Sequence, residues 1–474
     1  MNPLPRWITI LRRTLLGAAI VATVVAAVVV EEDIRGERAW ERFKAERAAT
    51  GRSLDPADYR EPEVPERENL FKAPVLARFF EPDGSWGRAW NAFSQRYELP
   101  WETWPTYGQW QTGKPTDFKA YYRLVQHLSP DAPVPSNPPE AEFALRRLDP
   151  IKADLDTLDA AALARPRTEI FGVQSDGALV PKSIAALKGL VQVLSWRASA
   201  ELALDLHQEA FADTYTALRL INGGLRYPTM VHDMIACAMA PRAVQPLWEG
   251  CLRHGWSRPQ LEQLEAAAVV IQSYGDVAAV VDRNQAGLAD FYADPSSRPF
   301  WMPLGWRKLS EIAGLDLGTL DLARAANPAD AMDAATLSSL AVFPEGRRHS
   351  LPAILWGAGN NWFYQGLVTT LISGQTALRL AHAACALERF RMDRGHYPAN
   401  LAALVPTYLD RVPADFIDGR PLRYAVAADD TYRLYSIGLN GIDEGGTLPS
   451  RKVTYGWNDK DGGGDWAWPS RAVP

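Results

Sequence analysis

A short segment near residue 110 has the spacing of a phosphate-binding loop. Gly108-Gln-Trp-Gln-Thr-Gly113-Lys114 places two glycines and a lysine as nucleotide-binding loops do. Pro115 follows where a Ser or Thr would have to reach magnesium, and no apolar strand precedes the segment. We therefore expect no nucleotide to bind here.

The residues that could bind a metal or act as a nucleophile are scattered along the sequence. The seven histidines show no His-Glu-x-x-His spacing; they are His127, His207, His232, His254, His349, His382 and His396. No Gly-x-Ser-x-Gly elbow marks a serine nucleophile, and carboxylate pairs can be drawn almost anywhere among 56 acidic residues. Cys237, Cys251 and Cys385 form no Cys-x-x-Cys pair. We expect Cys237 and Cys251 to be buried small hydrophobic residues, although oxidation outside the cytoplasm could join them. The sequence predicts no catalytic residues, and we expect the protein not to be an enzyme.

An uncharged apolar run lies close to the N-terminus. As a helix, Thr14–Val30 covers roughly 25 Å and nearly spans a bilayer, and Arg12 and Arg13 can extend to the lipid headgroups. Basic residues before the run and acidic residues after it predict a cytoplasmic N-terminus; they are Arg6, Arg12, Arg13, Glu31, Glu32 and Asp33.

We therefore expect residues 1–35 to form a cytoplasmic stub and a transmembrane anchor. The chain would cross the inner (cell) membrane of a double-membrane bacterium once, with its bulk in the periplasm. A cleaved signal peptide, for which no convincing cleavage site is present, and a buried helix are the alternatives.

Residues 36–140 are predicted to form a stalk and a segment rich in proline and tryptophan. The stalk continues the anchor helix, with Trp40 and Phe43 on one face. Farther on, prolines prevent long elements and aromatic residues cluster; these are Trp86, Trp90, Tyr97, Trp101, Trp104, Tyr107 and Trp110. Exposed rings could bind glycans or peptides, but we expect them to fill a core. Five prolines within 130–139 predict an extended connector.

Residues 141–345 show helical periodicity and are predicted to form a helical domain. Ser183–Leu206 and Glu209–Ile221 repeat apolar residues every three or four positions, which indicates a helical hairpin. Ser257 and Gln260 have the spacing of a capping box at the start of another helix, and Trp256 before them is placed to pack on it.

Residues 346–474 are predicted to form an α+β module. A long helix runs from about Trp362 to Arg394 and ends at Gly395, and the segments 422–426 and 431–437 have the pattern of a β-hairpin. The predicted fold class is mainly α with an α+β C-terminal module. It comprises an N-terminal transmembrane helix, a helical middle region and a long helix packed on a small antiparallel sheet.

Five motifs follow one another in the C-terminal region: Ala386-Leu-Glu-Arg-Phe-Arg-Met-Asp-Arg-Gly-His-Tyr-Pro398, Leu401-Ala-Ala-Leu-Val405, Asp415-Phe-Ile-Asp-Gly-Arg-Pro-Leu-Arg-Tyr424, Tyr432-Arg-Leu-Tyr-Ser-Ile-Gly438 and Asn440-Gly-Ile-Asp-Glu-Gly-Gly446. In their order and spacing they resemble the C-terminal domain of the type II secretion major pseudopilin, over about residues 378–468. The resemblance implies that the long helix packs on the small sheet and that the loop after the last hairpin strand binds calcium.

The resemblance also implies a set of calcium ligands. It places Asn440, where the family usually has an Asp, and Asp465 at side-chain positions, and the Ile437 carbonyl at a backbone position. With the neighbouring acidic oxygens, which calcium prefers, the expected metal site comprises Ile437, Asn440, Asp443, Glu444 and Asp465. The neutral Asn and the longer stretch 447–464 depart from the family, and a solvated acidic turn is the alternative.

The anchor differs from that of a pseudopilin filament subunit. In the family, the apolar helix carries a Glu near its start and continues directly into the C-terminal domain. Here no Glu precedes Glu31, and more than 300 residues separate the anchor from the module. The module is therefore expected to belong to a different kind of anchored protein.

The sequence predicts a membrane-anchored exported protein that acts as a structural or interaction component, or as a secretion-related assembly component. Its expected partners are the lipid bilayer, through Thr14–Val30, and other proteins of the envelope. The formal net charge of −6 argues against nucleic acid as a partner. The alternative is an exported glycan-binding protein or hydrolase that uses the Trp-rich segment.

Overall fold

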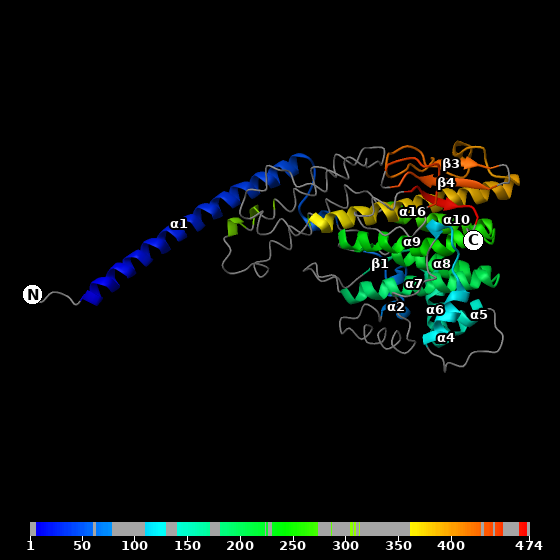
Figure 1. The fold of residues 1–474 in the computed structure, drawn as a ribbon, viewed down its shortest axis with the longest axis horizontal. Helices are drawn as coiled ribbons and strands as arrows, with labels where there is room; N and C mark the ends of the chain where they lie inside the picture. The colour runs from blue at the N-terminus through cyan, green and yellow to red at the C-terminus, as the bar shows by residue number, and fades with distance from the viewer. Residues whose placement is uncertain are drawn as a thin grey trace, which may run out of the picture.

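The computed structural model shows a mainly helical chain with a small sheet near its C-terminus (Figure 1). The described residues are 6–59, 63–77, 110–128, 140–170, 181–222, 224–225, 230–273, 286, 304–306, 308–309, 312, 361–427, 431–438, 441–448 and 464–471. Most of the Trp-rich segment, the proline connector and most of 274–345 lie outside them. The predicted fold class is confirmed in outline: the described residues are mainly helical, with an apolar N-terminal helix and a three-stranded antiparallel sheet.

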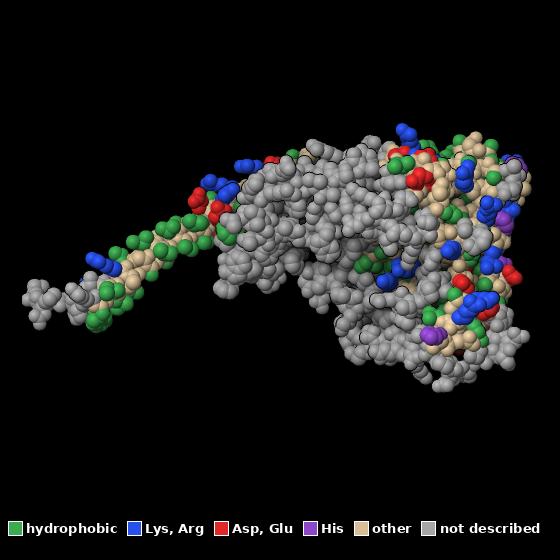
Figure 2. Space-filling view, in the orientation of Figure 1, with side chains coloured by type: hydrophobic (Ala, Val, Ile, Leu, Met, Phe, Trp, Pro, Cys, Tyr) green, Lys and Arg blue, Asp and Glu red, His purple; other side chains and the backbone are tan. Residues whose placement is uncertain are grey.

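Helix α1 (Arg6–Ala49) is long enough to cross a membrane and to extend well beyond it. Its 44 residues span roughly 66 Å, and it contains an apolar stretch of which nothing is buried by the rest of the protein. Leu15, Leu16 and Val21 are each more than 60% exposed. The predicted continuation of the apolar run into a charged helix is confirmed, and Figure 2 shows hydrophobic side chains along the projecting part of α1.

The second half of α1 contacts another part of the chain. The backbone N–H of Gly305 donates to Asp33 Oδ1 (2.8 Å), and the indole N–H of Trp306 donates to Glu32 Oε2 (3.1 Å). A Cβ on Gly36 would lie 2.3 Å from the Cα of Gly305, so only glycine permits this approach. Contacts between α1 and the rest of the protein therefore begin directly after the apolar run.

The middle of the chain forms a layered helical body. Its elements are η1 (Pro56–Tyr59), η2 (Leu70–Lys72), α2 (Pro74–Ala77), η3 (Trp110–Thr112), α4 (Phe118–Leu128), α5 (Glu140–Arg146), α6 (Asp149–Ala164), β1 (Glu169–Ile170), α7 (Pro181–Ala203), α8 (His207–Ile221), β2 (Gly224–Leu225), α9 (Met230–Leu252) and α10 (Arg258–Ser273). The predicted helical hairpin is α7 and α8 and is confirmed. Residues 189–202 of α7 are all buried, as expected for a central helix that other helices surround, and they include the charged residues Arg197 and Glu201.

The start of α10 follows the predicted capping pattern. The backbone N–H and the hydroxyl of Ser257 both donate to Gln260 Oε1 (2.8 and 3.0 Å). The preceding Trp256 is buried and donates its indole N–H to the carbonyl of Leu247 in α9 (3.0 Å). A Cβ on Gly250 would lie 2.0 Å from the Trp256 ring, so a glycine in α9 makes room for the indole. Trp256 thereby fixes α10 against α9.

The C-terminal module is built on α16 (Asn361–Arg394). Helix α16 ends where predicted, because Gly395 has a φ of +76° and its N–H bonds to the carbonyl of Arg391. After η7 (Leu401–Leu404), strands β3 (Arg423–Val426), β4 (Tyr432–Ser436) and β5 (Trp466–Pro469) pair antiparallel in the order β3-β4-β5. The predicted hairpin is β3 and β4; β5 completes the sheet.

Helix α16 lies between the sheet and α9 (Figure 1). One continuous apolar core extends from Leu70 through the helical body to Trp468 in β5. The indole N–H of Trp248 in α9 donates to the carbonyl of Pro469 (2.7 Å), and the rings of Trp110 and Trp468 lie 5.5 Å apart. The sheet and the helical body therefore share a core.

Candidate functional site

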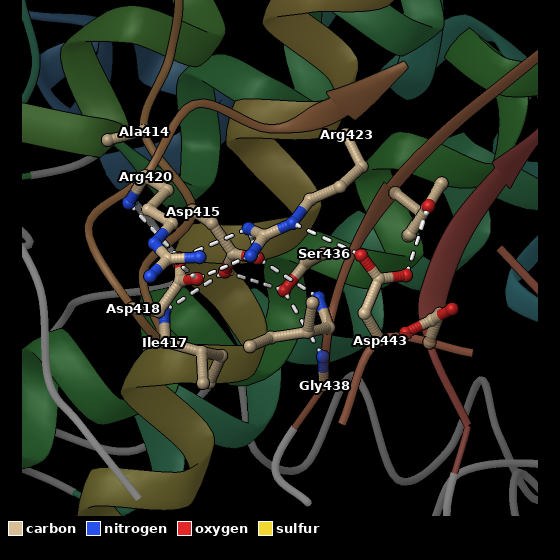
Figure 3. Close-up of polar contacts among 12 residues, drawn as sticks. Ala414, Asp415, Ile417, Asp418, Arg420, Arg423, Ser436, Gly438 and Asp443 are labelled. Carbon is tan, nitrogen blue, oxygen red and sulfur yellow. Dashed lines mark hydrogen bonds and ion pairs between the residues drawn. The ribbon is translucent and has the colours of Figure 1, made fainter. Parts of the chain in front are cut away.

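A buried carboxylate, Asp415, organises the loop between α16 and β3. Its Oδ1 accepts hydrogen bonds from the hydroxyl of Ser436 (2.7 Å) and the backbone N–H of Ile417 (3.0 Å), and its Oδ2 accepts one from the N–H of Ile437 (3.0 Å). Figure 3 shows these groups converging on Asp415 from the loop and from the end of β4. Asp415 is fully buried, so its negative charge requires these donors and a cation.

Arg423 at the start of β3 supplies that cation. One of its terminal nitrogens lies 2.8 Å from Asp415 Oδ2, and the other pairs with Asp418. Although burial opposes it, hydrogen bonding from Arg423 lowers the pKa of Asp418. Arg423 Nε also lies 3.9 Å from Asp443 Oδ2. Arg423 therefore connects the loop before β3 with the acidic turn after β4, as Figure 3 shows.

Asp465, immediately before β5, fixes that acidic turn. Its Oδ2 accepts hydrogen bonds from the backbone N–H groups of Glu444 (3.0 Å) and Gly446 (2.6 Å). Its Oδ1 is buried and has no hydrogen-bond partner among the described residues. Burial raises the pKa of Asp465, and the charges of Asp443 and Glu444 act in the same direction. An unpartnered buried oxygen of this kind is suited to act as a ligand of a cation.

The end of β4 lies against Asp465. Ser436 and Trp466 form the last pair of the β4–β5 ladder, so Ile437, directly after β4, and Asp465, directly before β5, both lie at the end of that ladder. Gly438 has a φ of +64°, and a Cβ there would lie 2.5 Å from the carbonyl oxygen of Gly464. A glycine is therefore needed for β4 to turn beside the start of β5.

The structure brings part of the predicted metal set together. Asp465, Glu444 and Ile437 lie together at the end of the β4–β5 ladder, whereas Asn440 lies outside the described residues. Asp443 is exposed, and its Oδ1 accepts from the hydroxyl of Tyr435 (3.1 Å) and from Gly445 N–H (3.0 Å). Within the described ranges, no three His, Cys, Asp or Glu side chains are arranged to hold a metal. Calcium at this end of the ladder stays a prediction, and Asp465 Oδ1 is the atom that fits it.

A second polar cluster lies inside the helical body around Arg197 of α7. Its guanidinium binds both carboxylate oxygens of Asp213 in α8 (2.6 Å each) and Asp159 Oδ2 in α6 (2.6 Å). Asp156 Oδ1 at 2.9 Å and Glu201 Oε1 at 3.8 Å complete the cluster. Four carboxylates therefore share one guanidinium.

Burial controls protonation in this cluster. It raises the pKa of Asp159 to about 8 and of Asp213 to about 8, and that of Glu201 to about 7. Repulsion among the carboxylates adds to this effect, while the charge of Arg197 opposes it. The cluster therefore retains protons at neutral pH.

The site residues predicted from the sequence include Asp443 and Asp465 but neither Asp415 nor any member of the Arg197 cluster. Asp415 appears in the sequence only within the Asp415–Tyr424 motif of the family resemblance, and two of its partners, Ser436 and Ile437, lie at the end of β4, farther along the chain. Asp159, Arg197 and Asp213 come from three different helices, and a charged residue within the apolar stretch of α7 was the one available signal.

Compared with models of known protein families, with curated proteins and with solved structures, the chain gives no significant match.

Proposed function

We propose that this chain is a single-pass protein of the inner membrane whose N-terminus is cytoplasmic and whose bulk is periplasmic. In this proposal it serves as a structural or interaction component of the envelope, or as a secretion-related assembly component. The observation that carries the proposal is the unburied apolar stretch of α1. Water is an unfavourable environment for such a surface, whereas a lipid bilayer would cover it.

Charges at the two ends of the apolar run support the proposed orientation. Arg12 and Arg13 precede the run, and Lys and Arg favour the cytoplasmic side. Glu32 and Asp33 follow it and already bind residues 305 and 306. The body of the protein therefore begins on the acidic side of the run, which is the periplasmic side in this proposal.

The C-terminal module supports a role in assembly without supporting a filament subunit. A long helix beside a small antiparallel sheet agrees with the architecture that the pseudopilin resemblance implies. In this chain, however, α16 is covered by α9 and α10 and is separate from α1. Residues 372–391 of α16 include no exposed residue, so this part of the helix offers no free face for a filament core.

The proposed calcium site would fasten the edge of this module. Asp465 Oδ1 would supply one ligand, and the Ile437 carbonyl, Asn440, Asp443 and Glu444 are the further oxygens that the proposal assigns. A bound cation would be a positively charged partner for the Asp465 carboxylate, and it would hold the turn 443–446 against β5.

The Trp-rich alternative receives no support from its one described tryptophan. Trp110 is 1% exposed, its backbone N–H donates to Gln245 Oε1 (2.7 Å), and its indole N–H donates to the carbonyl of Pro241 (3.1 Å). A ring enclosed in this way is core and is not part of a binding platform.

Reporter fusions test the proposed topology. A reporter enzyme that is active only outside the cytoplasm, fused after Pro474, is expected to be active, and a variant lacking residues 1–30 is expected to lose that activity. Alkaline carbonate is expected to leave the full chain in the membrane fraction. Activity of a cytoplasmic reporter at the same position would contradict the proposal, and release of a shortened chain would indicate a cleaved signal peptide.

A further inference from the structure

Two of the three cysteines meet between α9 and α16. Cys251 in the last turn of α9 and Cys385 in α16 are both buried in the same apolar core, where Cys385 acts on the Cys251 thiol. Three residues farther along each segment, His254 Nδ1 lies 3.0 Å from Glu388 Oε2. The two segments therefore run in the same direction, with residue 251 beside 385 and residue 254 beside 388.

The third cysteine lies far along the same pair of helices. A Cβ on Gly374 would lie 2.5 Å from the Cβ of Cys237, and Gln375 Nε2 lies 3.9 Å from Cys237 Sγ. Fourteen residues of α9 separate Cys237 from Cys251, which is about 21 Å, and eleven residues of α16 separate Gly374 from Cys385, which is about 16 Å. A disulfide needs Cα atoms within about 7 Å. The expectation that Cys237 and Cys251 could be joined is therefore wrong, because both lie on one helix.

We propose that Cys251 and Cys385 form a disulfide in the exported protein, which would join the helical body covalently to the C-terminal module. This inference rests on the proposed function, because disulfides persist outside the cytoplasm and are rare within it. In the structure all three cysteines are free thiols.

The oxidant in this proposal is a disulfide-donating thiol oxidoreductase of the envelope. One cysteine thiolate attacks a sulfur of the donor's disulfide, which forms a mixed disulfide and releases one donor thiolate. The second cysteine thiolate then attacks the protein sulfur of that mixed disulfide and releases the second donor thiolate. The two protein thiols lose two protons and two electrons, and the donor's disulfide gains them as two thiols.

The environment of Cys251 and Cys385 determines the stage of folding at which thiol–disulfide exchange can occur. Contact with Cys385 and burial raise the pKa of the Cys251 thiol, and the charge of Glu388 acts in the same direction. Because the thiolate is the nucleophile, a buried neutral thiol reacts slowly. The bond therefore forms before α9 and α16 close on each other. Once buried, it is shielded from reductants.

Thiol counting in the full-length chain tests the proposal. The anchored protein, produced in a double-membrane bacterium, is unfolded in the presence of N-ethylmaleimide, digested and analysed by mass spectrometry. We expect one alkylated cysteine, Cys237, and a peptide linked through Cys251 and Cys385 that disappears after reduction. Three alkylated cysteines in exported chain, or a linkage that involves Cys237, would overturn the proposal.

Single substitutions provide matched controls. Cys237→Ser is expected to leave the linked peptide unchanged, whereas Cys385→Ser is expected to leave Cys237 and Cys251 both alkylated. A linked peptide that survives in the Cys385→Ser variant would contradict the pairing.

Refolding separates this inference from the proposed localisation. The purified chain in detergent is reduced, unfolded and refolded with oxidised glutathione, and we expect the same linked peptide. If the bond forms on refolding but is absent in cells, and the reporter fusion in those cells shows a cytoplasmic C-terminus, the pairing is supported and the proposed localisation is contradicted. Absence of the bond after refolding, or from cells whose reporter is exported, overturns the disulfide.

Discussion

The carboxylate of Asp415 lies 2.8 Å from the guanidinium of Arg423, in a place where Asp415 is closed to solvent. The ion pair also receives donors from Ser436 and Ile437, so it joins the loop before β3 to the end of β4. Removing one member of such a buried network leaves the remaining polar groups without partners.

Asp415→Ala is expected to lower the free energy of unfolding by about 3 kcal/mol, because it leaves Ser436, the Ile437 N–H and part of Arg423 unsatisfied. Asp418→Ala is the matched control: it removes the other carboxylate on Arg423 but is more exposed, and we expect a loss of about 1 kcal/mol. Denaturant titration of the full chain in detergent measures both. Equal losses would contradict the central role of Asp415.

Calcium is expected to raise the melting temperature of the protein by binding at Asp465. At a free concentration 100 times the dissociation constant, one site adds about 2.7 kcal/mol. Asp465→Asn is expected to abolish the rise, while Asp410→Asn, outside the predicted set, is expected to keep it. Differential scanning fluorimetry with calcium and with a chelator gives the measurement. No shift in the unmodified protein would end the calcium proposal.

The Arg197 cluster is expected to make stability fall as pH rises from about 4 to about 8. Asp159 loses its proton near pH 4 when unfolded but near pH 8 when folded, so the folded state binds the extra proton between these values. Its contribution is fully present below pH 4 and is lost by about 1.4 kcal/mol per pH unit up to the folded pKa.

Asp159→Asn tests this pH dependence, because the amide resembles the protonated acid and does not titrate. The variant is expected to show a shallower decline in stability than the unmodified protein over pH 5–8. Asp156→Asn is the control, since Asp156 is about half exposed and its pKa is lowered by Lys152 and Arg197 despite partial burial. Identical slopes for Asp159→Asn and the unmodified protein would refute the assignment.

The contact between α1 and residues 304–306 is expected to depend on the absence of a side chain at Gly36. A Cβ there would lie 2.3 Å from the Cα of Gly305, so Gly36→Ala is expected to separate the segments and break the Gly305–Asp33 hydrogen bond. Hydrogen exchange at Gly305 is expected to accelerate at least tenfold. Gly17→Ala, whose Cβ meets nothing within 4 Å, is expected to leave exchange unchanged. Equal exchange in both variants would show that the contact is unimportant.

Local patterns were enough to predict several elements. The apolar run, the periodicity of α7 and α8, the Ser257–Gln260 cap and the glycine after α16 depend on residues close in sequence, and all are observed. The β3–β4 hairpin also follows from alternation around a short turn.

Features that depend on distant residues could not be predicted in this way. Two partners of Asp415, Ser436 and Ile437, lie 21 and 22 residues away at the end of β4, and the carboxylates of the Arg197 cluster come from α6, α7 and α8. The sharing of α16 between the sheet and α9 likewise depends on tertiary packing, and so does the placement of Cys251 beside Cys385. Periodicity identifies the buried face of an element but not the element that covers it.

Protease protection in spheroplasts tests the central claim most directly. With an epitope tag at the N-terminus and another after Pro474, protease added outside intact spheroplasts is expected to destroy the C-terminal tag. A membrane-bound fragment that contains most of α1 and the N-terminal tag is expected to survive. Survival of the C-terminal tag until the spheroplasts are lysed, with the tag accessible after lysis, would place the body of the protein in the cytoplasm and contradict the account.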